Sequence, residues 1–399
     1  MRRLIGVIAM LGAISLVEAA CAKNSTPQSS GGASGATSVK YDAAATGEGK
    51  LSLIAWPGYT QPSWVKPFQQ ATGCQVTVKY GNSSDEMVNL MSQQGGTLYD
   101  GVSASGDATN RLIASSAVAP VDVNSFPEYP DVMQTLQAPP HNTVNGVHYG
   151  VPYMWGPNFL MFNTDVVKPA PTSWDVVFEK TLNGQPNPYA GKITAYDSVI
   201  YIADAALYLK THQPSLGITD PYELTQDQLA AAVDLLKQQA PMIKKYWAVY
   251  TDEVDGFESG DMVVGTAWPV NQSIILTDKK VPVSSVYPSE GVTGWADTWM
   301  MSSHTTHPVC MAKWMEYSLR ASVQTQVAEY YGATPSNTKS CAQLNKDLGK
   351  DAANYHCGDD AFLAKVYLWK TPLPQCGNGQ SDCMDYNAWS ADWTAIRGS

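Results

Sequence analysis

The chain has 399 residues, of which 44% are hydrophobic and 15% are charged, and its formal net charge is −11. The hydrophobic fraction excludes a largely disordered chain, and the acidic balance argues against a surface that binds nucleic acid. The length predicts two or three domains. The sequence holds 12 Trp and 21 Tyr but only 7 Phe. Because Trp and Tyr combine an apolar ring with a polar group, they suit wet clefts as well as cores.

The first 20 residues are predicted to be an export signal. Arg2 and Arg3 precede the apolar run 4–17, which is followed by the small residues Ala19 and Ala20. This run is too short to span a bilayer comfortably, and no later stretch is long and apolar enough to be a second span. We therefore expect an exported protein whose signal peptide is removed.

Cys21 follows the small residues, as the lipidated cysteine does in a bacterial lipobox, although Glu18 departs from the apolar residue usual at that place. Lipidation of Cys21 would anchor the protein on the outer face of the cytoplasmic membrane. Ordinary cleavage, with Cys21 left free, is the alternative. Residues 21–47 are rich in Ser, Gly, Thr and Ala, and they are predicted to form a flexible tether between the anchor and the folded part.

After the tether, strands and helices are predicted to alternate. The predicted strands are residues 51–55, 75–80 and 99–103, and the predicted helices are 63–72, which ends at Gly73, and 85–93, with another helix starting at 111–115. Short apolar or alternating runs favour strands, and a glycine just past a periodic segment favours a helix end. This alternation predicts βαβ units and a mostly parallel sheet.

The second half of the chain continues this pattern. The predicted strands are residues 192–195, 263–267 and the segment 281–287, and the predicted helices are 225–239 and 310–319. Leu229, Val233 and Leu236 fall on one face of the first of these helices. The predicted fold class is therefore α/β.

Candidate site residues follow these strands. In open α/β sheets, ligands lie beyond the carboxyl ends of strands. The aromatic and polar residues at such places are Trp56 and Tyr59 after the first strand, Ser105 and Asp107 after the third, Asp197 after 192–195, Trp268 after 263–267, and Trp295 and Asp297 beyond 281–287.

Six cysteines lie beyond Cys21, and an even number in an exported chain predicts disulfides. They are Cys74, Cys310, Cys341, Cys357, Cys376 and Cys383. The local pairs Cys341–Cys357 and Cys376–Cys383 would staple a loop-rich C-terminal segment and leave Cys74 with Cys310, but six cysteines allow 15 pairings. Zinc is the competing interpretation. No C-x2-C pair occurs and export disfavours free thiolates, so we expect no metal.

Several stretches together resemble a known family, the periplasmic spermidine/putrescine-binding proteins of ABC importers, which are bacterial extracellular solute-binding proteins. The stretches are AWPGYTQPSWVKPFQQATGCQV, YDGVSASGDATNRLI, YGVPYMWGPNFLMFNTD, GDMVVGTAWPVNQS, YPSEGVTGWADTWMM and YYGATPSN. They occur in the family's order and cover most of residues 48–340. The C-terminal tail with its four cysteines is not covered well.

The resemblance implies a two-lobed periplasmic-binding-protein fold of type II with two crossover segments. Lobe one would be residues 48–153 and 297–336, and lobe two would be residues 154–296 and 337–399, including the disulfide-rich tail. The crossings would lie at 151–155 and near Asp297. Cys74 and Cys310 would then both fall in lobe one, in keeping with their pairing.

The resemblance also implies a site for a polyamine. An ammonium needs a carboxylate when it is buried, and methylenes and cations both favour aromatic faces. Carried over by position, Trp56, Tyr59, Trp268 and Trp295 match the aromatic wall, Ser105 a hydrogen-bonding position, and Asp197 and Asp297 the acidic positions. We expect Trp295 and Asp297 to matter most, because the Trp-x-Asp unit is intact.

Three positions depart from the family. Gly58 and Ile200 stand where the family has carboxylates, and Asp107 stands where it has Tyr. Asp107 could replace a lost amine partner or cap the helix that contains Arg111. The exact ligand is therefore open: a shorter diamine, a differently placed triamine, or another solute such as thiamine, an amino acid, a sugar or ferric iron.

A hydrolase and a carrier of ferric iron are alternative functions. A hydrolase could use clustered carboxylates, but the sequence has no G-x-S-x-G, H-E-x-x-H or G-x-x-x-x-G-K-[ST] motif, so we expect no enzyme and no cofactor. The adjacent Tyr330 and Tyr331 resemble a ferric-iron pair, with packing at a helix end as the alternative. The expected partners are a small polyamine, an ABC permease with a separate ATPase, and the membrane through the lipid anchor. Nucleic acid is excluded, and a monomer is expected.

Overall fold

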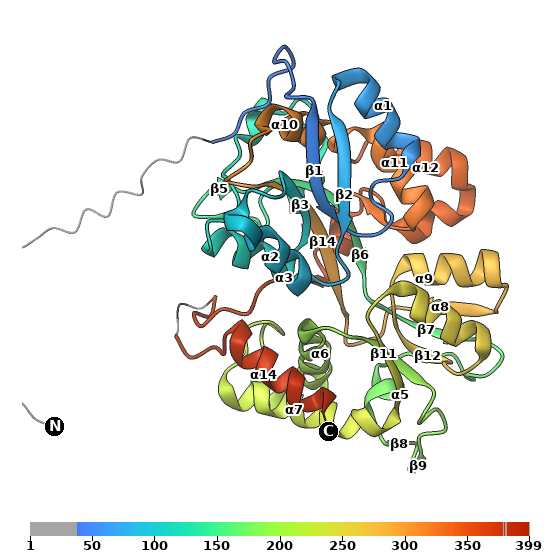
Figure 1. Ribbon diagram of the computed structural model, residues 1–399. Coiled ribbons are helices and arrows are strands. Elements are labelled where there is room, and N and C mark those ends of the chain that lie inside the picture. Colours follow the sequence, from blue (N-terminus) through green and yellow to red (C-terminus); the bar gives the residue numbers. More distant parts are fainter. Residues whose placement is uncertain (1–37, 378, 380, 399) are drawn as a thin grey trace, which may run out of the picture. The chain divides into compact units, whose positions relative to one another are not determined.

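Two mixed β-sheets form the framework of the computed structural model, which describes residues 38–377, 379 and 381–398 (Figure 1). The strand order of the larger sheet is β15–β6–β14–β3–β1–β2, with β16 paired to β14 off this path, and that of the smaller is β11–β10–β12–β7–β13. We call the larger sheet with its helices lobe one, and the smaller sheet with its helices lobe two.

The strands of lobe one are β1 (Lys50–Ala55), β2 (Gln75–Tyr80), β3 (Gly101–Ser105), β6 (Val151–Pro157), β14 (Val292–Met301), β15 (Thr334–Pro335) and β16 (Val366–Leu368). Those of lobe two are β7 (Phe159–Asn163), β10 (Ile193–Tyr196), β11 (Ile243–Trp247), β12 (Val264–Ala267) and β13 (Val283–Val286). Two small hairpins are β4 (Thr143–Val144) with β5 (Val147–His148) and β8 (Thr181–Leu182) with β9 (Gln185–Pro186).

Helices cover both sheets. Those nearest the larger sheet are α1 (Pro62–Thr72), α2 (Ser84–Ser92), α3 (Gly106–Ala114), α4 (Gln134–Gln137), α10 (Pro308–Leu319), α11 (Ala321–Tyr331), α12 (Ser340–Leu348) and α13 (Asp360–Leu363). Those around the smaller sheet are α5 (Asp175–Phe178), α6 (Ile202–His212), α7 (Gln226–Gln239), α8 (Tyr250–Ser259), α9 (Pro269–Ile274) and α14 (Tyr386–Arg397).

Local sequence signals set several of these boundaries as predicted. α1 ends at Gly73, which takes a left-handed conformation (φ 75°). α7 begins with a capping box in which Thr225 and Gln228 satisfy each other's backbone N–H groups. Its predicted apolar face is buried. β2 spans the residues predicted for it.

The sheets are mixed, which corrects the expected mostly parallel arrangement. The βαβ units do pair in parallel: β1 with β2 and β3, and β10 with β11 and β12. β14 instead runs antiparallel to β3 and β6, and β7 runs antiparallel to β12 and β13. These antiparallel strands adjoin the points where the chain passes between the lobes, and such passages carry no crossover helix of the βαβ kind.

The residues around Trp295 form a strand, whereas the sequence placed them in a connection beyond residues 281–287. β14 is ten residues long, and all ten are buried. A strand buried on both faces shows no alternation of polar and apolar residues, so its extent is hard to read from the sequence.

β3 and α3 also differ from expectation, because β3 ends at Ser105 and α3 begins directly at Gly106, five residues before the predicted helix start at Arg111. Gly106 is required by a close approach: a Cβ there would lie 1.9 Å from the carbonyl oxygen of Trp369 in the tail.

The chain passes between the lobes three times, one more than expected. β6 leads through Asn158 into β7, and the chain returns from β13 into β14. The third passage is the C-terminal tail. α12 packs on α11 in lobe one, β16 pairs with the first residues of β14, and α14 packs on α7 in lobe two. The tail, 337–399, is therefore divided between both lobes, which corrects the expectation that it belongs wholly to lobe two.

Residues 38–47 pack on lobe one, which corrects the expectation that the tether reaches residue 47. Val39 forms a bridge with Val121, and its amide donates to Pro120 O (2.8 Å). The ring of Tyr41 packs against Phe126 at 5.7 Å between centroids. The apolar surface of these two side chains is enough to hold the segment against lobe one. The predicted signal peptide and Cys21 lie outside the described residues.

The three predicted disulfides are present: Cys74–Cys310, Cys341–Cys357 and Cys376–Cys383. The first joins residues 236 positions apart, one directly before β2 and the other in α10. None of the described helices is both long enough and apolar enough to cross a membrane.

Removing the long-range disulfide is expected to cost more stability than removing a short one. Replacing Cys74 and Cys310 together with Ala should lower the free energy of unfolding by about 2–4 kcal/mol, because a large loop is no longer closed in the unfolded chain. Urea denaturation measures the loss. The matched control is the double Ala variant of Cys376 and Cys383, which are 7 positions apart and should lose less. Equal losses would contradict the expectation.

Candidate ligand-binding site

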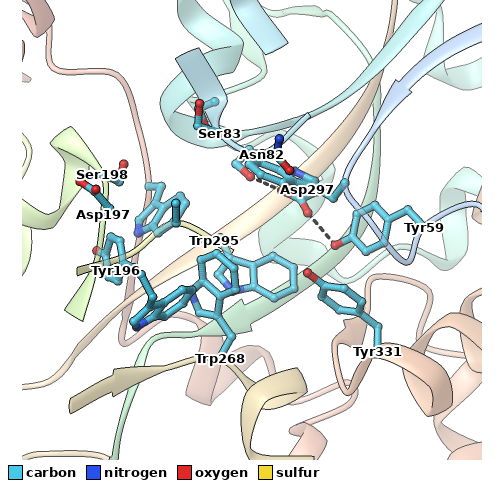
Figure 2. Close-up of a pocket in the computed structure, with 16 residues that line it drawn as sticks. Tyr59, Asn82, Ser83, Tyr196, Asp197, Ser198, Trp268, Trp295, Asp297 and Tyr331 are labelled. Carbon is cyan, nitrogen blue, oxygen red and sulfur yellow. Dashed lines mark hydrogen bonds between the residues drawn. The ribbon is translucent and has the colours of Figure 1, made fainter. Parts of the chain in front are cut away.

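A pocket lies where strands of both sheets end (Figure 2). It encloses about 530 Å³ of space free of protein atoms, including the part that opens to solvent. Its lining residues are Trp56, Tyr59, Asn82, Ser83, Ser84, Ser105, Tyr196, Asp197, Ser198, Trp247, Ala248, Trp268, Trp295, Asp297, Tyr331 and Trp369. Lobe one, lobe two and the tail all contribute.

The carboxyl group of Asp297 is the acidic centre of this pocket. Asp297 is only 3% exposed and lies opposite Ser105 in the antiparallel pairing of β14 with β3. Its Oδ2 accepts a hydrogen bond from the Tyr59 hydroxyl at 2.6 Å, and its Oδ1 accepts one from the Ser105 hydroxyl. Both donors are neutral, and no cationic side chain among the described residues pairs with this carboxylate.

Burial shifts the protonation of Asp297. Loss of water around the carboxyl group raises its pKa to about 7, against the opposing effect of the hydrogen bonds from Ser105 and Tyr59. The buried Asp107 nearby adds a further rise through like-charge repulsion. A cation placed in the pocket would relieve this cost and favour the ionised form.

Indole and phenol rings form the walls. Trp268 is central: its ring lies edge-on to Trp247 at 4.6 Å between centroids and 6.4 Å from both Tyr196 and Trp369. On the other side, Trp295 meets Tyr331 at 6.5 Å. Such faces pack against methylenes and attract cations by roughly 0.5–2 kcal/mol each.

A buried hydrogen-bond network positions Trp268. Its Nε1 donates to Asn158 Oδ1 at 2.9 Å, and Asn158 Nδ2 donates to Thr293 Oγ1 at 2.7 Å. Thr293 in turn donates to Asp204, which also accepts from the Tyr196 hydroxyl. Because Asn158 and Thr293 lie where β6 and β14 pass between the lobes, the network fixes two wall residues at this crossing.

The structure brings together seven of the eight predicted site residues. These are Trp56, Tyr59, Ser105, Asp197, Trp268, Trp295 and Asp297. Asp107 does not line the pocket. It is fully buried in the first turn of α3, where its Oδ1 accepts from Ser84 Oγ at 2.8 Å, so it lies behind the wall that Ser84 presents.

The surroundings of Gly58 and Ile200 explain why neither position carries the carboxylate that the family has there. Gly58 has φ +103°, and a Cβ there would lie 2.6 Å from the ring of Tyr331. Any side chain at this position would therefore collide with a pocket wall. Ile200 is completely buried and lies outside the pocket lining.

Several lining residues are not among those predicted from the sequence. Tyr196 and Trp247 end β10 and β11, and the rule that placed Trp268 after its strand could have found both. Trp369 gave no signal, because it lies in the tail that the family resemblance covers poorly.

The tyrosine pair considered for iron does not converge. Tyr331 lies in the pocket wall, whereas Tyr330 is 56% exposed at the end of α11. Within the described part of the chain, the one cluster of His, Cys, Asp or Glu close enough to hold a metal is Cys376, Asp382 and Cys383. Its two cysteines are joined in a disulfide, so they offer no thiolate.

Two α/β lobes with a pocket at the strand ends of both sheets define a ligand-binding protein of the two-lobed type. Comparison with known sequences agrees: the profile of the bacterial extracellular solute-binding proteins matches residues 63–355. The chain belongs to this family.

Its relatives share low identity over most of their length. The spermidine/putrescine-binding periplasmic protein of Escherichia coli K12 is 22% identical over 343 residues, which cover 86% of this chain and 92% of that protein. The putrescine/agmatine-binding protein of Pseudomonas aeruginosa is 25% identical over 338 residues, covering 80% and 87%. These relatives are binding proteins rather than enzymes.

Solved structures show the same fold. The spermidine/putrescine ABC transporter substrate-binding protein of Streptococcus pneumoniae superposes with a TM-score of 0.67 at 20% identity, covering 87% of this chain and 97% of that one. The binding protein MotA from A. tumefaciens B6, in complex with glucopine, gives 0.65 at 15% identity, covering 87% and 99%.

Proposed function

We propose that this solute-binding protein captures a small organic amine of the spermidine/putrescine class in the pocket and delivers it to an ABC importer. The observation that carries the proposal is Asp297, a buried carboxyl group hydrogen-bonded by neutral hydroxyls alone and surrounded by aromatic rings. An ammonium is the partner that this arrangement lacks. The names of the relatives in E. coli and P. aeruginosa support the same class.

The physical balance favours a cation over a neutral solute. A charge-assisted hydrogen bond to a carboxylate contributes roughly 1.5–3 kcal/mol, and desolvated aromatic faces add to this. A sugar would use the flat faces of Trp268 and Trp295 but would leave the Asp297 charge uncompensated. The pocket therefore selects for positive charge at one end of its ligand.

Delivery would follow from closure of the lobes over the ligand. The sequence has no phosphate-binding loop, so the energy for transport would come from a separate ATPase bound to the permease. A lipid on Cys21 would hold the protein, acting as a monomer, on the outer face of the cytoplasmic membrane, close to this permease.

Thermal unfolding with added ligands tests the proposal. Putrescine, N-acetylputrescine or spermidine should raise the melting temperature, because a ligand that binds only the folded state at a hundred times its Kd stabilises it by about 2.7 kcal/mol. Thiamine, maltose and ferric iron are the comparison arms. A shift with maltose or iron, and none with any amine, would overturn the amine assignment.

A further inference from the structure

The two acidic residues of the pocket differ in their partners. Asp297 meets neutral hydroxyl donors, whereas both oxygens of Asp197 are engaged by the C-terminal helix α14. Trp393 Nε1 donates to Asp197 Oδ1, and Arg397 Nη2 donates to Asp197 Oδ2, each at 3.2 Å. In Figure 2, Asp197 lies at the left of the view, well apart from Asp297 near its centre.

The guanidinium on Asp197 is held by more than this ion pair. Arg397 also lies over the ring of Tyr246, 4.3 Å from its centroid. The helix that carries it is fixed to lobe two, because Trp389 and Ile396 of α14 are almost completely buried and α14 packs on α7. The side chain is 38% exposed, so Arg397 lies at the edge of the core rather than within it.

The two ends of the pocket therefore differ in the charge that they offer to a ligand. At the Asp297 end the carboxylate is available to a ligand cation. At the Asp197 end, the carboxylate is already paired with Arg397, and a second ammonium placed there would have to share it with the guanidinium. Like charges brought together in this way oppose binding. The remaining lining groups at this end, such as the Ser198 hydroxyl, are neutral.

We propose that the pocket selects an amine with one positive charge, bound at Asp297, and an uncharged polar far end lying toward Asp197. The chemical class is a monocationic amine, such as a diamine acylated on one nitrogen, rather than a free diamine. Arg397 is the specificity-determining residue. This inference rests on the proposed function, since it concerns the ligand of the same pocket.

Calorimetry with putrescine and N-acetylputrescine tests the inference on the full chain, because the two probes differ in one charge. The wild-type protein should bind N-acetylputrescine at least as tightly as putrescine. In Arg397→Met, which keeps the apolar stem and removes the cation that pairs with Asp197, putrescine should gain about tenfold in affinity while N-acetylputrescine changes little. Arg397→Lys retains the charge and should keep the wild-type preference.

The possible results separate this inference from the proposed function. Tenfold tighter binding of putrescine than of N-acetylputrescine by the wild type would overturn the inference and leave the amine function standing. An Arg397→Met variant that folds with an unchanged melting temperature but shows no gain for putrescine would also overturn it. Failure of both probes to bind would overturn the proposed function itself.

Discussion

Replacing Asp297 with Asn is expected to weaken the binding of amines by a hundredfold or more while the fold is retained. The change removes the charge that we propose meets the ligand ammonium, and leaving a buried charge without its partner costs about 3–5 kcal/mol. One of the two hydroxyls of Tyr59 and Ser105 can still donate to the amide oxygen, and the other can rotate to accept from the amide nitrogen, so the free protein keeps two hydrogen bonds here. Calorimetry with putrescine and N-acetylputrescine measures the loss.

The matched control is Glu316→Gln. Glu316 is also buried, its pKa is likewise raised to about 7 by desolvation, and it lies on α10 outside the pocket lining. This variant makes the same charge change and should bind amines as the wild type does. If Asp297→Asn and Glu316→Gln bind with equal affinity, Asp297 does not meet the ligand.

Amine affinity is expected to rise with pH until Asp297 is ionised. The pKa of this carboxyl group is raised to about 7 in the free protein, so below that pH it is neutral and a cation must displace its proton. Affinity should therefore fall about a hundredfold from pH 8 to pH 5 and stay level above pH 8. The neighbouring phenol of Tyr59 stays protonated throughout, since burial raises its pKa further above its usual value.

Calorimetry in buffers of different ionisation enthalpy provides a second measurement of the coupling between amine binding and loss of the Asp297 proton. Near pH 6 the binding of an amine should release close to one proton, and at pH 8.5 almost none. In the Asp297→Asn variant the pH dependence should disappear. A wild-type affinity that does not change between pH 5 and pH 8 would show that the ligand charge is met elsewhere.

Much of the fold could be predicted because local signals and global packing agree in the βαβ parts. The Gly73 helix end, the capping box at Thr225 and the alternation in β2 are each visible within a few residues. β14 gave no comparable signal, because a strand buried on both faces carries no alternation. Its antiparallel pairing is a property of the passage between the lobes rather than of its own residues.

The site could be predicted where side chains follow strand ends. The prediction was wrong or incomplete where segments distant in the sequence meet. Trp268 and Asp297 were found from position and resemblance. Asp107 looked equivalent to them on the chain, but packing of Ser84 over its carboxylate separates it from the pocket. Trp369 lines the pocket from the tail, and Arg397 of the tail pairs with the lining residue Asp197, over contacts with no local signature.

The third passage between the lobes has a mechanical consequence. Near the start of α14, Tyr386 donates to Asp85 of lobe one at 2.7 Å and stacks under the guanidinium of Arg111, while the last turn of the helix grips lobe two through Asp197. Two connecting strands alone leave the lobes free to move apart. Here, opening of the cleft would break either the contacts of Tyr386 with lobe one or the packing of α14 on α7. The tail thus links the two lobes and limits how far they can separate. A truncation before residue 386 would remove this link and allow a wider opening.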